Sequence, residues 1–122
     1  MPKSVLVVDD NAAIRRSLCQ VFRSEQDFEI CGEAQNGREG IERAIHLHPD
    51  LIILDLSMPI MNGMEAARVL NRLMPGVPLI IFSAHSEVLS ETDARSAGVW
   101  AQVSKSENVS VLIAKARHLV EH

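Results

Sequence analysis

Short runs of apolar residues alternate along this chain with segments in which apolar residues recur every three or four positions. The apolar runs predict five strands, at residues 5–8, 28–32, 51–54, 77–82 and 99–103. The segments that follow predict helices, because their apolar positions fall on one helical face. In the first segment these positions are Ile14, Leu18, Val21 and Phe22. We therefore expect five strand–helix units in succession.

The predicted strands are apolar at consecutive positions, as in VLVV at 5–8 and LIIL at 51–54. Strands of this kind are buried on both faces, which is typical of a parallel sheet covered by helices. Their alternation with helices predicts an α/β fold with a doubly wound, five-stranded parallel sheet flanked by five helices. With 122 residues the chain can bury one such core, and we expect a single domain over residues 1–122.

Individual residues predict where the helices begin and end. Gly63 is expected to open the third helix, and Ser106 is expected to cap the N-terminus of the fifth. The polar segment 87–97 predicts the fourth helix, which Gly98 is expected to close in the left-handed conformation.

Composition excludes several classes of protein. The net charge is −4 and the 12 Lys and Arg residues are scattered, which argues against a face that binds a nucleic-acid backbone by itself. The longest apolar runs have four residues, far fewer than the roughly 20 of a membrane-spanning helix, so we expect no membrane association. No signal peptide fits between Met1 and Val5, so we expect a cytoplasmic protein with free thiols at Cys19 and Cys31.

Polar residues gather at the carboxyl ends of the predicted strands, where doubly wound sheets bind ligands. They are Asp9 and Asp10 after the first strand, Asp55 after the third, Ser83 (followed by Ala84) after the fourth, and Ser104 and Lys105 after the fifth. Three carboxylates at one edge repel one another unless one takes up a proton or they share a cation. An all-oxygen site with solvent access suits Mg²⁺, which completes its shell with water and phosphate oxygens.

The same groups fit phosphoryl transfer to a carboxylate. Asp55 would be the nucleophile that attacks phosphorus in line with the leaving group. Lys105 and the metal would neutralise the phosphoryl oxygens, and the hydroxyl of Ser83 would donate to one of them. Each residue alone has an ordinary structural role as a cap, a turn residue or a solvated group. Their joint placement at four strand ends favours the functional interpretation.

Four motifs in this arrangement resemble the receiver domain of two-component response regulators, over essentially the whole chain. They are VLVVDD at 5–10, LDLSMPIMNGMEA at 54–66, FSA at 82–84 and Lys105 after the last strand. The resemblance implies a flavodoxin-like, CheY-like fold. It also implies that a sensor histidine kinase or a phosphotransfer protein phosphorylates Asp55. By the same resemblance we expect no enzyme activity beyond assistance to the domain's own phosphorylation and dephosphorylation.

The resemblance further implies a set of metal ligands. Asp10 and Asp55 would bind Mg²⁺ directly, with Asp9 often acting through water. The backbone carbonyl of Ser57 would supply a further ligand.

Other residues would act on the phosphoryl group. The resemblance implies that the hydroxyl of Ser83, the backbone of Ala84 and the ammonium of Lys105 contact it. Ser57 and His85 lie two positions after Asp55 and Ser83, where family members tune the rate at which the phosphoryl group is lost.

The chain departs from the family at the residue that usually switches. Family members carry an aromatic residue three positions before the lysine, which swings inward on phosphorylation, whereas this chain has Gln102. Trp100 lies two positions earlier and, by strand alternation, on the same side as Gln102. We hypothesise that Trp100 supplies the aromatic surface of a partner-binding face formed by the fourth helix, fifth strand and fifth helix. The alternative is that Trp100 only packs against a neighbouring helix.

The output of the predicted receiver is suggested by two features. Ser106, in place of the proline that follows the lysine in many receivers, and the segment FEICGEAQNGREG at 28–40 resemble the NarL/LuxR class. That class regulates transcription through a C-terminal helix-turn-helix domain, which is absent from this chain, so any contact with DNA would be made by that domain. Receivers often dimerise on activation, which makes a homodimer a further implied partner.

Two alternatives stay open. One is a stand-alone receiver that carries phosphate in a relay or binds a target protein directly. The other is a hydrolase with Asp55 as covalent nucleophile, although a haloacid-dehalogenase-type phosphatase has a second aspartate where this chain has Ser57. A nucleotide-binding module is disfavoured, because the chain has no glycine-rich phosphate-binding motif.

Overall fold

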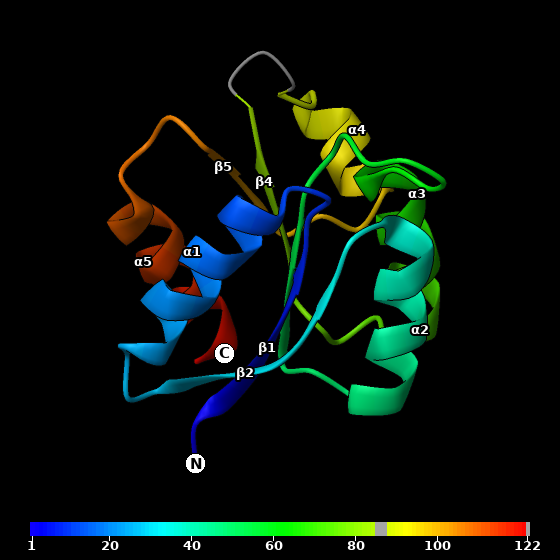
Figure 1. Ribbon diagram of the computed structural model, residues 1–122. Helices are drawn as coiled ribbons and strands as arrows, with labels where there is room; N and C mark the ends of the chain where they lie inside the picture. Colours follow the sequence, from blue (N-terminus) through cyan, green and yellow to red (C-terminus); the bar gives the residue numbers. More distant parts are fainter. Residues whose placement is uncertain (85–87, 122) are drawn as a thin grey trace.

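Strands and helices alternate along the chain in the computed structural model, which describes residues 1–84 and 88–121 (Figure 1). The strands are β1 (Lys3–Val8), β2 (Phe28–Ala34), β3 (Leu51–Leu54), β4 (Leu79–Ser83) and β5 (Ala101–Ser104). The helices are α1 (Ala12–Arg23), α2 (Gly37–Leu47), α3 (Gly63–Leu73), α4 (Glu91–Ser96) and α5 (Val109–Val120). The predicted fold class is confirmed.

All strands join one parallel sheet in the order β2-β1-β3-β4-β5. The chain winds outward from β1 to β2 and then returns past β1 to β3. In this register Val8, the last residue of β1, lies opposite Leu54, the last residue of β3. The point where the winding reverses therefore lies beyond these two residues, which is where such sheets bind ligands.

Helices cover both faces of the sheet. α1 and α5 lie on one face, and α2 and α3 lie on the other (Figure 1). Side chains of each strand alternate between two cores: Val5 and Val7 pack under α1 and α5, whereas Leu6 and Val8 pack under α2 and α3. This double burial explains why the strands are apolar at consecutive positions.

The third helix begins as predicted. Its first residue is Gly63, and Asn62 before it accepts a hydrogen bond from the amide of Glu65. The Glu65 carboxylate accepts one from the amide of Asn62 in return, which completes a capping box.

The predicted start of the fifth helix is wrong. Asn108, not Ser106, caps α5, because its side-chain oxygen accepts a hydrogen bond from the amide of Ser110. The hydroxyl of Ser106 instead lies 2.7 Å from that of Ser104 in the preceding loop. The amide side chain of Asn108 is as good a cap as a hydroxyl, and it lies closer to the first apolar position, Val109.

Other boundaries also move. α4 begins at Glu91, four residues later than predicted. The hydroxyl of Ser90 accepts a hydrogen bond from the amide of Asp93 and so caps the helix there. β5 begins at Ala101, one residue after Trp100, but the amide of Trp100 still donates to the carbonyl of Leu79 on β4. Trp100 and Gln102 line the same hollow, which agrees with the expected alternation.

The cysteines are free, as expected. Burial raises the pKa of both the Cys19 and the Cys31 thiol, which keeps them protonated. Within residues 1–84 and 88–121, no helix combines the length and the apolar character needed to cross a membrane.

Gly98 closes the end of α4 in the left-handed conformation, as predicted, with φ of 79°. A Cβ atom added there would also lie 2.5 Å from the Cβ of Asn71 on α3. We expect Gly98→Ala to lower the free energy of unfolding by about 1–3 kcal/mol, because it adds both backbone strain and a clash. Urea denaturation measures this loss. An unchanged midpoint would contradict it.

Candidate functional site

Two neighbouring strands deliver the acidic residues to one edge of the sheet. Asp9 follows β1 directly, and its amide donates to the carbonyl of Ala34 at the end of β2. Asp55 follows β3, and its amide donates to the carbonyl of Val8. These hydrogen bonds continue the ladder one residue past each strand, so both aspartates have a fixed backbone. Both are almost fully buried, at 2% and 4% exposure, whereas Asp10 is exposed.

The sequence prediction that three carboxylates converge is confirmed. One oxygen each from Asp9, Asp10 and Asp55 lies within 4.8 Å of the others. Lys105 joins them from the loop after β5, with Nζ 3.1 Å from Oδ2 of Asp9 and 3.2 Å from Oδ1 of Asp55. One ammonium therefore faces three carboxylates, which leaves an excess of negative charge at the site.

Asp9 is held at every polar atom. Its Oδ1 accepts a hydrogen bond from the amide of Asn11, and its Oδ2 forms an ion pair with Lys105. Its backbone carbonyl accepts a hydrogen bond from Nη1 of Arg15 over 2.7 Å. Arg15 in turn forms an ion pair with Glu33 of β2 at 3.3 Å. Sequence reasoning missed Arg15; its only signal was a guanidinium placed one turn into the helix that follows the aspartate.

Asp55 is less well satisfied. Among the buried side-chain oxygen and nitrogen atoms of residues 1–84 and 88–121, only Oδ1 of Asp55 has no hydrogen-bond partner. The Nζ atom of Lys105 lies 3.2 Å from it, as an ion-pair contact. Burial raises the pKa of Asp55 to about 6, the charge of Asp9 adds to the rise, and Lys105 opposes it. Burial alone would lower the pKa of Lys105, but its contacts with Asp9 and Asp55 outweigh this and raise it.

These observations fit a bound divalent cation. An acidic cluster with one carboxylate oxygen left unsatisfied and with excess negative charge offers the hard oxygen ligands that Mg²⁺ prefers. Asp10 is exposed, so the cluster is open to solvent.

Three further predicted site residues lie at the end of β4 and in the loop after β3. Ser83 is the last residue of β4 and is buried, and its carbonyl accepts the backbone amide of Lys105 over 2.8 Å, which ties the ends of β4 and β5 together. Ala84 follows it, half-buried. Ser57 lies exposed in the loop two residues after Asp55. His85 lies outside the described residues.

Gln102 and Trp100 lie away from the acidic cluster. Gln102 is half-buried in β5, and its carboxamide bonds to the backbone of Leu89 in the loop before α4. Trp100 is 44% exposed. Both line one hollow of about 210 Å³ between β5 and α4.

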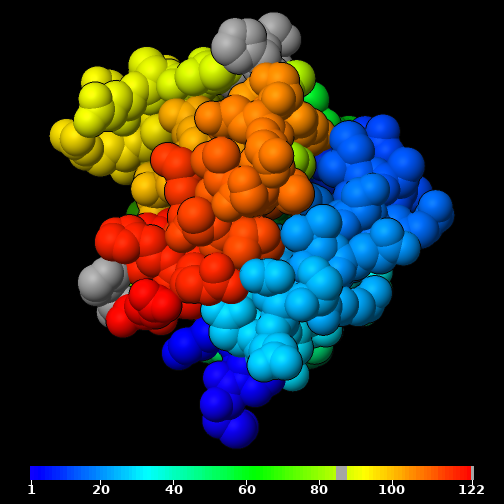
Figure 2. All heavy atoms as spheres, turned by 90° about the vertical axis from the view of Figure 1, so that its left-hand side faces the viewer, coloured from blue at the N-terminus to red at the C-terminus, as the bar shows by residue number. Residues whose placement is uncertain are grey.

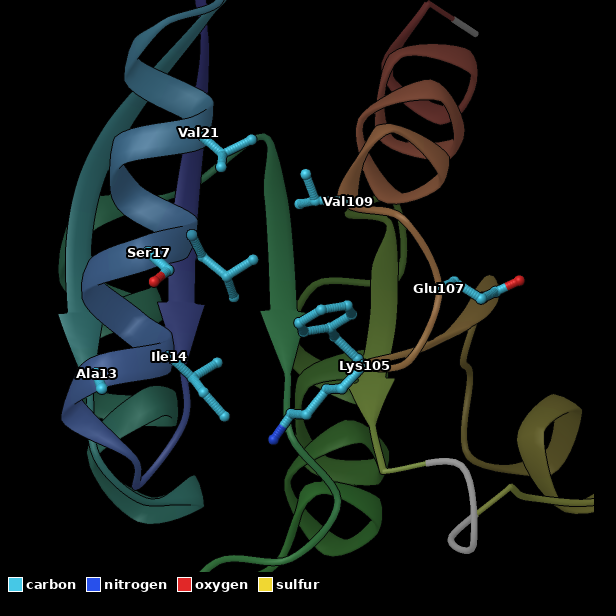
Figure 3. Close-up of a pocket in the computed structure, with 9 residues that line it drawn as sticks. Ala13, Ile14, Ser17, Val21, Lys105, Glu107 and Val109 are labelled. Atoms are coloured by element: carbon cyan, nitrogen blue, oxygen red, sulfur yellow. The ribbon is translucent and has the colours of Figure 1, made fainter.

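An apolar groove of about 390 Å³ runs beside the site, between α1 and α5. Figure 2 shows these two helices next to each other on one face of the molecule. Ile14 and Val21 of α1 face Val109 of α5 across the groove, and Lys105 lies at its end opposite Ile14 (Figure 3). The side chain that contacts Asp55 is therefore also a wall of this groove.

Comparisons with known proteins agree with this geometry. The family model described as response regulator receiver domain matches residues 5–117. Among curated proteins, the chain is 44% identical over 84 residues to a protein-glutamate methylesterase/protein-glutamine glutaminase of Hahella chejuensis, covering 69% of this chain and 21% of that protein. It is 37% identical over 107 residues to a protein of the same name from a Nocardioides species, covering 86% of this chain and 29% of that protein.

Solved structures show the same fold. The response regulator domain of Thermotoga maritima CheB superposes with a TM-score of 0.91 at 30% identity, covering 100% of this chain and 98% of that one. The chain thus spans less than a third of the length of the curated relatives named above, but 98% of this solved domain. On the family match and the shared fold, the chain belongs to the response regulator receiver domains of two-component signalling.

Proposed function

We propose that this receiver domain accepts a phosphoryl group on Asp55 and passes the signal to an output. The observation that carries the proposal is the position of Asp55. It is a buried carboxylate at the switch point of the sheet, with one unsatisfied oxygen beside a lysine and two further aspartates. A structural carboxylate in such a place would be expected to have its hydrogen bonds complete.

The chemistry follows from the groups present. An oxygen of Asp55 attacks the phosphorus of a phosphohistidine, the phosphorus–nitrogen bond breaks, and the leaving imidazole takes up a proton. With a pKa of about 6, Asp55 is ionised at pH 7 and above even without a cation, and is therefore ready to attack. Lys105 is held at the same place and neutralises a phosphoryl oxygen. The hydroxyl of Ser83 donates a hydrogen bond to another phosphoryl oxygen.

Mg²⁺ would be held by Asp10 and Asp55, with Asp9 and the carbonyl of Ser57 as further ligands. Bound there, the ion supplies positive charge against the charge of the transferring group. Asp9 is fixed by its contacts to Asn11, Arg15 and Lys105, which orient its carboxylate toward Asp55 and Asp10.

The phosphoryl donor is a sensor histidine kinase or a phosphotransfer protein. The groove between α1 and α5 supports this, because it places an apolar contact surface directly beside Lys105. A donor helix that packs there could bring its phosphohistidine to Asp55. A homodimer of the active domain, if it forms, would use a different surface, and exposed Trp100 makes the β5 side our choice for it.

Two outputs are supported by different observations. Ser106 and the segment 28–40 favour a helix-turn-helix domain that binds DNA. The methylesterase relatives favour a catalytic output domain. The coding sequence downstream of His122 discriminates between them, and a stop codon there would favour the stand-alone receiver instead.

Labelling with a small phosphodonor tests the function of Asp55. We expect incubation with acetyl phosphate and Mg²⁺ to add one phosphoryl group, seen by intact mass and released by hydroxylamine, as an acyl phosphate is. Asp55→Asn should abolish the addition, because the amide is no nucleophile for phosphorus.

Glu42→Gln is the matched control, because it removes one exposed carboxylate on α2 and should leave labelling unchanged. Folded wild-type protein that takes up no phosphoryl group with Mg²⁺ would refute the proposal. Labelling that persists in Asp55→Asn would place the acceptor elsewhere.

A further inference from the structure

The side chain of Gln102 holds the backbone of the loop before α4 through two hydrogen bonds. The amide of Leu89 donates to Oε1 of Gln102 over 3.0 Å. Nε2 of Gln102 donates to the carbonyl oxygen of Leu89 over 3.1 Å. The carboxamide therefore pairs with Leu89 much as a peptide group of a neighbouring strand would.

This pairing is specific to a carboxamide. It needs one donor and one acceptor side by side, and turning the group over would set donor against donor and acceptor against acceptor. A glutamate lacks the donor, and an aromatic ring lacks both groups in this geometry. The residue that departs from the family pattern thus has its own structural role.

The clamp connects the phosphorylation site to α4. Gln102 lies on β5, three residues before Lys105, whose ammonium contacts Asp55. Leu89 lies one residue before Ser90, the N-cap of α4. One side chain therefore joins the strand that leads to the site with the start of the neighbouring helix.

Gln102 also lines two hollows. One, of about 330 Å³, is lined by Ser83 and Val88, and the other, of about 210 Å³, is lined by Trp100 and Arg95. Gln102 borders both. A displacement of Gln102 would therefore change both hollows.

We propose that Gln102 is a positioning residue that holds Leu89 on β5 and carries changes at Asp55 to the surface around Trp100, in place of a rotating aromatic side chain. The coupling rests on the proposed function of Asp55, whereas the clamp does not.

Hydrogen exchange measured by NMR tests the clamp without any ligand. In Gln102→Leu, which keeps a similar volume, we expect the amide of Leu89 to exchange at least about tenfold faster, because it loses its acceptor. Gln102→Glu retains an acceptor and should exchange at an intermediate rate. Gln20→Leu, on the exposed side of α1, is the control and should change nothing. Exchange at Ile53 in the central strand reports whether overall stability has changed.

Beryllofluoride with Mg²⁺, a mimic of the phosphoryl group, tests the coupling. In the wild type we expect amide shifts around Asp55 and a change in Trp100 fluorescence. In Gln102→Leu the shifts around Asp55 should persist, while the Trp100 response is lost. If Gln102 had only a structural role, the substitution would leave both the amide shifts around Asp55 and the Trp100 response, or would remove both.

Each contrary result has a distinct meaning. Unchanged exchange at Leu89 in Gln102→Leu would overturn the clamp, and an intact Trp100 response in that variant would overturn the coupling. If beryllofluoride with Mg²⁺ causes no amide shifts near Asp55 in the wild type, the function proposed for Asp55 fails. The exchange measurement, made without the reagent, still decides the clamp.

Discussion

Gly63→Ala is expected to lower the free energy of unfolding by about 3 kcal/mol or more and to displace Asp55. A Cβ atom at this position would fall on the carbonyl oxygen of Asp55, and it would lie 2.9 Å from the carbonyl carbon and 3.0 Å from the Cα of Leu56. All of these are backbone atoms, so no side chain can rotate away. The amide of Gly63 also donates to the carbonyl of Leu56, which holds the two segments together.

Gly76→Ala is the matched control, because a Cβ atom at Gly76 meets nothing within 4 Å. We expect this variant to be neutral or more stable by up to about 1 kcal/mol, since alanine restricts the unfolded chain. Urea denaturation of both variants, followed by labelling with acetyl phosphate, measures the two effects. Equal stability of the two variants would contradict this prediction. It would mean that the backbone of Asp55 and Leu56 can move to accommodate a Cβ atom at position 63.

Asp55→Asn is expected to stabilise the metal-free protein at neutral pH. The folded protein holds Asp55 at a pKa of about 6 instead of the ordinary 3.8, first because of burial and then because of Asp9. A folded pKa above the unfolded one means that the stabilisation is complete below pH 3.8 and is lost as the pH rises through about 6. The ionised form therefore costs up to about 3 kcal/mol above that range, and the amide avoids this cost.

The pH profile distinguishes this effect from a general gain in stability. With a chelator present, the difference between Asp55→Asn and wild type should be near zero at pH 4 and should grow between pH 4 and 7. Mg²⁺ should reduce the difference at pH 7, because it stabilises the wild type by binding to the folded state. Glu42→Gln removes the same charge from an exposed site and is the control for the loss of one negative charge. A difference that does not depend on pH would contradict the pKa of Asp55.

Most of the architecture could be predicted because strands buried on both faces leave a clear signal. The runs at 5–8 and 51–54 fall inside β1 and β3, and the residue after each is the aspartate that the site needs. The register that pairs Val8 with Leu54 follows from the same order of strands, so the convergence of the acidic residues was predictable too.

The errors fall where the signal is carried by single polar side chains. The N-cap of α5 could be Ser106 or Asn108 by residue type, and only the folded loop shows which one reaches a backbone amide. The bonds of Gln102 to Leu89 join residues 13 apart through an irregular loop, and no periodic pattern marks such a contact. Arg15 was missed for a similar reason, since its partner is a backbone carbonyl.

The division of the interior into two cores has a consequence for how such a domain can diversify. The core under α1 and α5 lies beneath the groove beside Lys105, whereas the core under α2 and α3 supports the loop that holds Asp55 through Gly63. Since the sheet separates the two, substitutions in one core should add to those in the other with little interaction. A lineage could therefore reshape the groove surface of one layer by core substitutions while the loop after Asp55 in the other layer keeps its packing.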